Sequence, residues 1–183
     1  MKKALCCLLV LLGCFGLFGC GGDQVDDTVA DGTDAAAADT EAVADVQQDE
    51  FHGVTFEVPA DWEKVADESN PDVVYYSTGT DFLLLQYSNV QDSVVDNSDD
   101  FLKGMESGFD NFSVSNQEVI NVGGTDCLHF EFSGASEGTE YAGNCISVNV
   151  PDGLVSIGMY DSDNDGDYSS IFQAVLDSIQ IAQ

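Results

Sequence analysis

Alternating apolar and polar residues predict a series of short strands between residues 54 and 160. Val54, Phe56 and Val58 alternate with polar residues, which is typical of a half-buried strand. Further strand candidates cover residues 73–77, 82–90, 118–122, 125–133, 139–150 and 154–160. Because turn-forming residues separate neighbouring candidates, we expect antiparallel hairpins.

Two segments show helical rather than strand periodicity. Ser98 precedes two aspartates, which predicts an N-cap with acids in the first turn, and Phe101, Met105 and Phe109 recur every four residues. The second segment, residues 168–179, places one apolar stripe on a single face. That stripe consists of Tyr168, Ile171, Phe172, Val175, Leu176 and Ile179.

The dipeptide Asp152-Gly153 between two apolar runs predicts a tight hairpin. If Pro151 faces Leu154, the alternate apolar residues of both strands fall on one face. These residues are Ile146, Val148, Val150, Val155, Ile157 and Met159.

The element order predicts an α+β domain, an antiparallel sheet of about seven strands covered by two helices. Residues 53–62, GVTFEVPADW, resemble the entry strand and P-x-x-W corner of the Mog1/PsbP-like α/β/α sandwich superfamily. Residues 172–179, FQAVLDSI, resemble its closing helix. The resemblance covers most of residues 51–183 and implies that fold, but it transfers no catalytic or partner-binding residue to this chain.

The start of the chain has the layout of a secretory signal. Lys2 and Lys3 precede an uncharged apolar run, residues 4–18. As a helix this run is about 22 Å long, whereas the hydrocarbon core of a bilayer is about 30 Å thick. The run is therefore short for a membrane span.

Residues 17–20, LFGC, resemble the lipobox of bacterial lipoproteins, in which cleavage precedes a cysteine that carries lipid. The resemblance implies lipid attachment at Cys20, including a palmitate-type acyl chain, and several acyl chains on one cysteine anchor a protein stably. Residues 11–14, LLGC, form a rival match at Cys14. Cleavage there would leave large apolar side chains exposed, which favours Cys20. An ordinary signal peptide or an uncleaved anchor remains an alternative on the same side of the membrane.

The domain organisation follows from these patterns. Residues 1–19 are the expected lipoprotein signal peptide, residues 20–50 an acidic disordered tether, and residues 51–183 a single α+β domain. Residues 21–50 contain ten acidic residues and neither aromatic nor basic residues, so they bury too little apolar surface to order. Such a tether holds the domain away from the membrane.

The formal charge of the chain is −30, and it limits the classes of partner. Without residues 1–19, Lys64 and Lys103 are the remaining basic residues against 34 acidic ones. Nucleic acid and anionic lipid headgroups are poor partners, because protein affinity for both depends on Lys and Arg, so we expect no nucleic acid to bind. Cations and basic surfaces fit better, and plain solubility is the alternative explanation.

Cys127 and Cys145 are the two cysteines of the expected domain. If the loop between their strands is centred on Ser136, the two cysteines face each other on one side of the sheet, where a disulfide fits. An extracytoplasmic location permits this bond. Two buried free thiols, or a register error of one residue, are the alternatives.

The segment 161–167, DSDNDGD, resembles the first half of an EF-hand loop. Asp161, Asp163 and Asp165 occupy the first, third and fifth ligand positions, with Asp167 beyond them. Phe172 stands at the twelfth position, where a glutamate is required, so Ca²⁺ is the one cofactor considered and only as weak binding. The alternative is an acidic turn in which Asp165 or Asp167 caps the final helix.

The sequence provides one candidate acid-base pair, His129 with Glu131, and Ser133 further along the same strand. Such a row is more typical of a solvated strand face, so we expect no enzyme. The predicted function is a lipid-anchored, extracytoplasmic binding or accessory protein, held at the cell membrane through Cys20 and contacting an envelope or surface protein. The alternative is a weak Ca²⁺-dependent cell-surface module. The sequence leaves the oligomeric state open.

Overall fold

Two antiparallel sheets and two helices form the structure, a computed structural model that describes residues 45–66, 69–77, 81–162 and 168–182. The elements are β1 (Val46–Phe51), β2 (Val54–Pro59), β3 (Glu63–Ala66), β4 (Val73–Ser77), β5 (Asp81–Ser88), α1 (Ser98–Glu106), β6 (Asp110–Val122), β7 (Thr125–Ser136), β8 (Thr139–Val150), β9 (Gly153–Asp161), α2 (Tyr168–Ser178) and β10 (Gln180–Ile181).

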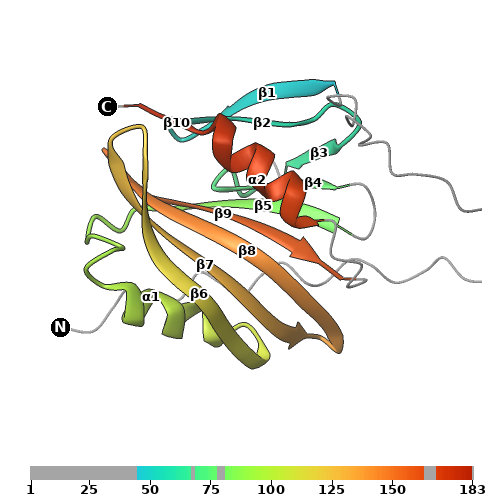
Figure 1. Ribbon diagram of the computed structural model, residues 1–183, viewed down its shortest axis with the longest axis vertical. Helices are drawn as coiled ribbons and strands as arrows, with labels where there is room; N and C mark the ends of the chain where they lie inside the picture. The colour runs from blue at the N-terminus through green and yellow to red at the C-terminus, as the bar shows by residue number, and fades with distance from the viewer. Residues whose placement is uncertain (1–44, 67–68, 78–80, 163–167, 183) are drawn as a thin grey trace, which may run out of the picture.

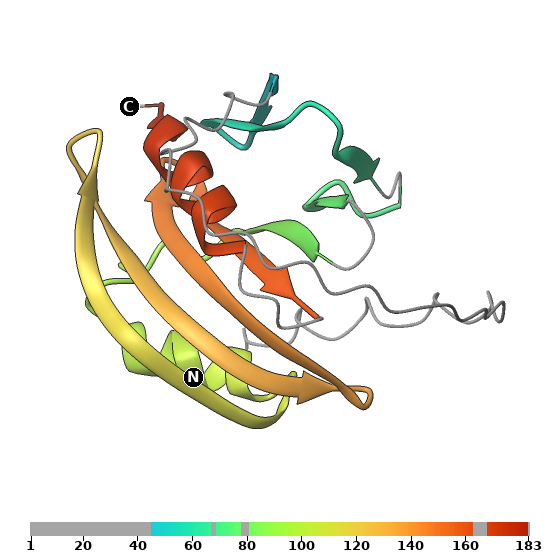
Figure 2. The ribbon, with the colours of Figure 1, turned by 45° about the vertical axis from the view of Figure 1, so that its right-hand side comes forward.

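The larger sheet has seven strands in the order β3-β4-β5-β9-β8-β7-β6, and the smaller sheet has the order β1-β2-β10. Figure 1 shows α2 and the small sheet on one side of the large sheet and α1 at the other side. The long strands β6, β7 and β8 bend along their length, and β6 forms the outer margin (Figure 2). This architecture confirms the predicted α+β fold with a seven-stranded antiparallel sheet.

The α2-side core fills the space between the large sheet and the layer formed by α2 and the small sheet. Val54, Phe56 and Val58 are at most 1% exposed, as their alternation predicts. From α2, Phe172 and Val175 are buried, and Ile179 just after the helix joins them. Each fully buried apolar side chain of this size contributes about 1.5–3 kcal/mol, so the two predicted stripes account for much of this layer.

The α1-side core covers the opposite face of the large sheet. Met105 of α1 is buried against Leu128, Phe130 and Phe132 of β7. The predicted helical stripe is confirmed at Met105 and in part at its neighbour Phe101, which is half-buried. Phe109, the third residue of the predicted stripe, lies beyond the end of α1, at the turn into β6. It still packs on this core.

The β8–β9 hairpin keeps the predicted face but has a different register. Val150 pairs with Gly153, so Pro151 and Asp152 form the turn. The pairing is shifted by two residues from the predicted one, and a two-residue shift returns every side chain to the same face. All six apolar residues expected on one face therefore lie in the α2-side core.

The β7–β8 hairpin differs from the prediction by an odd number of residues. Its turn is Glu137-Gly138, both with positive φ (52° and 85°), and Ser136 pairs with Thr139. The predicted centre was Ser136 itself, so facing positions are shifted by three residues. An odd shift exchanges the two faces of one strand relative to the other.

Ordered structure begins earlier than predicted. All of β1 except its last residue, Phe51, lies in the segment 20–50 that we expected to be a tether, and all six residues of β1 pair with β2. The expectations for the signal peptide, for Cys20 and for residues up to 44 fall outside the described residues. Within the described ranges, no helix is long and apolar enough to cross a membrane.

Candidate functional site

Cys127 and Cys145 do not form the predicted disulfide. Both thiols are free and buried. Cys127 belongs to the α2-side core and Cys145, paired with Phe130, to the α1-side core, so the sheet lies between them. Burial raises the pKa of Cys127 to about 11 and that of Cys145 to about 12. A raised thiol pKa leaves little thiolate at neutral pH, so neither cysteine is suited to nucleophilic chemistry.

The acidic turn is described only at its beginning. Asp161 ends β9, is fully buried, and pairs across the sheet with Asp81 of β5, which is 7% exposed. Asp163, Asp165 and Asp167 lie outside the described residues. Among the residues that the structure does describe, no group of three or more potential ligands could hold a metal ion.

His129 contacts a different carboxylate from the predicted one. Its Nδ1 lies 3.2 Å from Oε1 of Glu118, directly opposite on β6. Its ring stacks on Phe172 of α2 at a centroid distance of 5.9 Å. Glu131 instead accepts a 2.7 Å hydrogen bond from Asn116 Nδ2. The predicted acid-base pair is therefore not assembled, and His129 joins a strand edge to α2.

A groove between α1 and β6 is a feature that sequence reasoning missed. It has a volume of about 260 Å³. One side of the groove is a face of α1, and the other side is the first half of β6. Its lining consists of Asp99, Leu102, Lys103, Glu106, Phe112 and Val114. Apolar side chains from both elements thus meet two carboxylates and one amine within a single depression.

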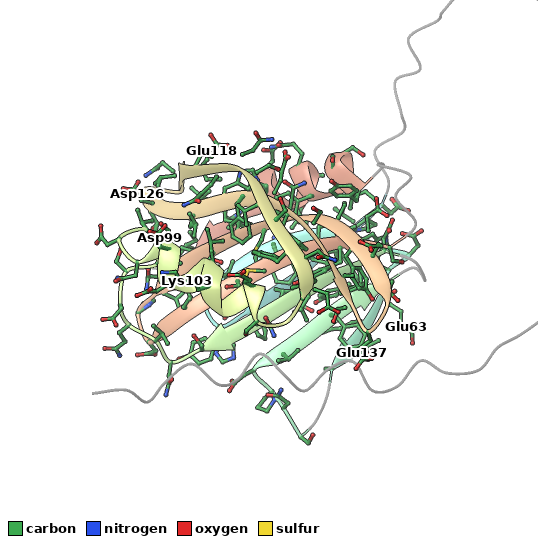
Figure 3. The ribbon with its side chains drawn as sticks, turned by 90° about the horizontal axis from the view of Figure 1, so that it is seen from below. Glu63, Asp99, Lys103, Glu118, Asp126 and Glu137 are labelled. Carbon is green, nitrogen blue, oxygen red and sulfur yellow. The ribbon has the colours of Figure 1, made fainter. Side chains whose placement is uncertain are left out.

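The local sequence explains how α1 reaches this position. The helix begins at Ser98, with Asn97 rather than the predicted Ser98 in the cap position. Two aspartates in the first turn and Lys103 in the last turn match the helix dipole. Lys103 Nζ lies 3.4 Å from Asp100 Oδ1, and both side chains are largely exposed. Figure 3 looks onto this helix and shows Asp99 and Lys103 together on its outer surface.

The second wall of the groove is the outermost strand of the large sheet. β6 is thirteen residues long, pairs with β7 on one side and ends the strand order. Its pairing shifts register between Asp110 and Ser113 and again between Ser115 and Glu118, as at β-bulges. The second shift moves the strand's phase by one residue. Val119, which is 53% exposed, consequently lies opposite Leu128, on the α1 side of the sheet.

Comparisons with known proteins support the fold. No protein-family model and no curated protein sequence matches the chain. Cyanobacterial PsbP (CyanoP) from Synechocystis sp. PCC 6803 is similar at 15% identity and a TM-score of 0.58, covering 80% of this chain and 98% of that one.

Two further solved structures are similar. LpqN, a protein involved in cell envelope biogenesis of Mycobacterium tuberculosis, shares 14% identity at a TM-score of 0.54, covering 75% of this chain and 92% of that one. PA94 of Pseudomonas aeruginosa, a protein of unknown function, shares 11% identity at a TM-score of 0.53, covering 75% and 98%. At such identities the likeness shows the fold alone, and that fold is the PsbP-like α+β sandwich that the resemblance of residues 53–62 and 172–179 implied.

Proposed function

We propose that this chain is a lipid-anchored, extracytoplasmic, non-catalytic accessory protein that binds a protein partner at the cell envelope. Lys2, Lys3, the apolar run and the LFGC segment ending at Cys20 support the anchor. LpqN, which is similar in fold, is involved in cell envelope biogenesis, and this is compatible with that location. The proposed role needs no cofactor and no nucleic acid.

The groove between α1 and β6 is the single observation that carries the binding role. It combines the apolar side chains of Leu102, Phe112 and Val114 with the carboxylates of Asp99 and Glu106. Apolar surfaces with a few placed polar groups are typical of binding sites.

The anchor is tested by replacing Cys20 with Ser. We expect the native protein to sediment with membranes and to incorporate an alkyne-labelled palmitate, and the Cys20→Ser variant to lose the label. Cys14→Ser is the matched control and should retain both properties. A labelled Cys20→Ser variant, or an unlabelled native protein in the cytosol, would contradict the anchor.

The binding role is tested by crosslinking in intact cells followed by mass spectrometry. One variant carries a photo-crosslinking residue in place of Val119, on the α1 side of β6. The control variant carries it in place of Asp177, on α2. We expect Val119 to capture a defined membrane or envelope protein that Asp177 does not capture. Capture of cytosolic proteins alone would contradict the proposed location.

One observation favours the alternative of a weak Ca²⁺-dependent cell-surface module. Asp81 and Asp161 are both buried and lie directly opposite each other on β5 and β9. Carboxylate oxygens that lie close together are the kind of ligand that Ca²⁺ takes. Asp161 also begins the segment that would supply Asp163, Asp165 and Asp167 as further oxygen ligands.

Calorimetric titration of the whole protein with CaCl₂ tests the Ca²⁺ alternative. We expect saturable heat that is lost when Asp161, Asp163 and Asp165 are replaced by Asn. The matched control replaces three exposed acids elsewhere, Asp92, Asp96 and Asp99, by Asn and should retain the heat. Equal heat in all three proteins would mean diffuse counterion binding and would remove the alternative.

A further inference from the structure

We propose that the outer edge of β6 and the adjoining groove receive an extended, basic segment of the partner protein, which pairs with β6 and extends the large sheet. This inference rests on the proposed binding function and names the chemistry of the partner. Strand addition of this kind takes its affinity from main-chain hydrogen bonds and its specificity from pockets for alternate side chains.

The edge of β6 has the length and exposure that strand addition requires. Among the described residues no strand lies on its outer side, because β6 is the last strand in the order. Most of its thirteen residues are exposed. The opposite edge of the same sheet, β3, has only four residues. Outward main-chain donors and acceptors along β6 therefore form the longer template.

Apolar side chains continue along the α1 side of β6. Phe112 and Val114 line the groove, and Val119 follows on the same side after the bulge. Val119 is 53% exposed and is one of two large apolar residues with that much exposure among the described residues. Alternate side chains of an added strand would cover Val119 and enter the groove, because side chains of neighbouring strands lie side by side.

The groove suits a lysine or arginine of the partner. The apolar wall for the aliphatic stem consists of Leu102, Phe112 and Val114. The carboxylates of Asp99 and Glu106 line the same groove and can pair with the charged end. Lys103 of this chain occupies the same groove lining, so it competes with an incoming cation. Replacing Lys103 should accordingly strengthen binding.

Charge also decides which protein can add to this edge. A second copy of this chain carries the same charge of −30 and would be repelled. The exposed Glu118 adds a further like charge that disfavours pairing between copies. A basic segment escapes this repulsion, which makes it the occupant that the edge accepts.

The probe is a capped octapeptide of alternating lysine and valine, titrated into the whole protein in nanodiscs of zwitterionic lipid at about 0.1 M salt, where charges farther apart than about 10 Å are screened. We expect saturable binding and slower hydrogen–deuterium exchange in β6 but not in β3. The same peptide with alternate backbone amides methylated should bind at least about tenfold more weakly, because it has lost main-chain donors.

Charge variants test the groove. The double variant Asp99→Lys with Glu106→Lys should bind the peptide at least about tenfold more weakly, and Lys103→Glu should bind it more tightly. Asp61→Lys with Glu63→Lys makes the same change of charge at a distant, exposed edge and should leave the affinity within about twofold; Figure 3 shows Glu63 at the far side of the molecule from Asp99. Unchanged melting temperatures verify that the variants fold.

Four results would overturn the inference: no saturable binding, equal binding of the methylated peptide, equal weakening by the Asp61/Glu63 pair, or protection that avoids β6. These outcomes are independent of the anchor. If the protein is palmitate-labelled but crosslinks to its partner through another surface, the proposed function stands and strand addition at β6 is wrong. An unmodified Cys20 would remove the anchor without affecting peptide binding.

Discussion

Cys127 and Cys145 lie on opposite faces of the large sheet, Cys127 in the α2-side core and Cys145 in the α1-side core. Both side chains are buried, Cys127 at 0% exposure and Cys145 at 2%. A disulfide requires Cβ atoms about 3.5–4.5 Å apart that point toward each other, which side chains on opposite faces cannot satisfy. Each cysteine therefore behaves as a small apolar core residue.

We predict that both thiols are free and unreactive in the folded protein. Burial raises the pKa of both groups, so little thiolate is present near neutral pH, and the cores exclude reagents. Without reductant, iodoacetamide should label neither residue in the native state and both after unfolding in guanidinium, as read by peptide mapping. A peptide joining Cys127 to Cys145 would contradict the placement.

Whether the sequence predicts the correct face of a strand depends on the size of the register error. An even shift keeps every side chain on its face, and an odd shift exchanges the faces. The shift of two residues at the β8–β9 turn preserved the face of Val148 and Ile157, so the core of that hairpin was predicted correctly. The shift of three residues at Glu137-Gly138 moved Cys127 and Cys145 to opposite faces. The strand pattern alone did not distinguish the two-residue turn, because both strands carry apolar residues on both faces.

The strand that forms one wall of the groove was predicted only in part, because two bulges interrupt it. Phe112 and Val114 alternate in one phase and Val119 follows in the other, so the run from 110 to 122 shows no continuous strand pattern. Only its end, residues 118–122, was predicted. β1 was missed for a related reason: its acidic, glutamine-containing sequence is stabilised by pairing with β2 rather than by an apolar pattern of its own.

A carboxylate of β1 joins the two sheets. Asp49 accepts a 2.5 Å hydrogen bond from the Tyr76 hydroxyl of β4 and forms an ion pair with Lys64 of β3. Burial by itself raises the Asp49 pKa, but the hydrogen bonds from Lys64 and Tyr76 outweigh it and hold the pKa below the ordinary value of 3.8. The ionised carboxylate is therefore favoured by folding.

We predict that Asp49→Asn lowers the free energy of unfolding by about 1–2 kcal/mol at neutral pH. Because the folded pKa of Asp49 is lowered, its contribution is complete above the ordinary value of 3.8 and disappears as the pH falls toward the folded value. Urea unfolding of both proteins across this range should show the difference shrinking. Asp100→Asn, which removes an exposed ion pair with Lys103, should change little at any pH.

We predict that Gly143→Ala destabilises the large sheet by about 1–3 kcal/mol or more. A Cβ at Gly143 of β8 would lie 2.1 Å from the Met159 backbone oxygen and 2.8 Å from Phe132 Cζ. Gly134→Ala on β7 is the control, since its Cβ would meet the Phe109 side chain at 3.2 Å, which can shift slightly. Thermal unfolding should rank Gly143→Ala well below Gly134→Ala, and equal melting temperatures would contradict the close approach.

Asn149 fixes the segment that leads into α1. Its side-chain oxygen accepts a 2.8 Å hydrogen bond from the Val94 backbone amide, and its Nδ2 donates a 3.0 Å bond to the Asp92 carbonyl. Val94 is buried in the α1-side core. The connection thus sets where α1 begins, and α1 forms one wall of the groove against β6.

We predict that Asn149→Ala loosens α1 while the α2-side core stays intact. Losing two hydrogen bonds to backbone groups, one of them to a buried residue, should cost about 1–3 kcal/mol locally. Hydrogen–deuterium exchange should accelerate in residues 98–106 and stay unchanged in 168–178. Asn121→Ala is the matched control, because it removes bonds to Asp126 and Gly124 at the exposed β6–β7 turn. If that variant accelerates α1 exchange equally, Asn149 does not position the helix.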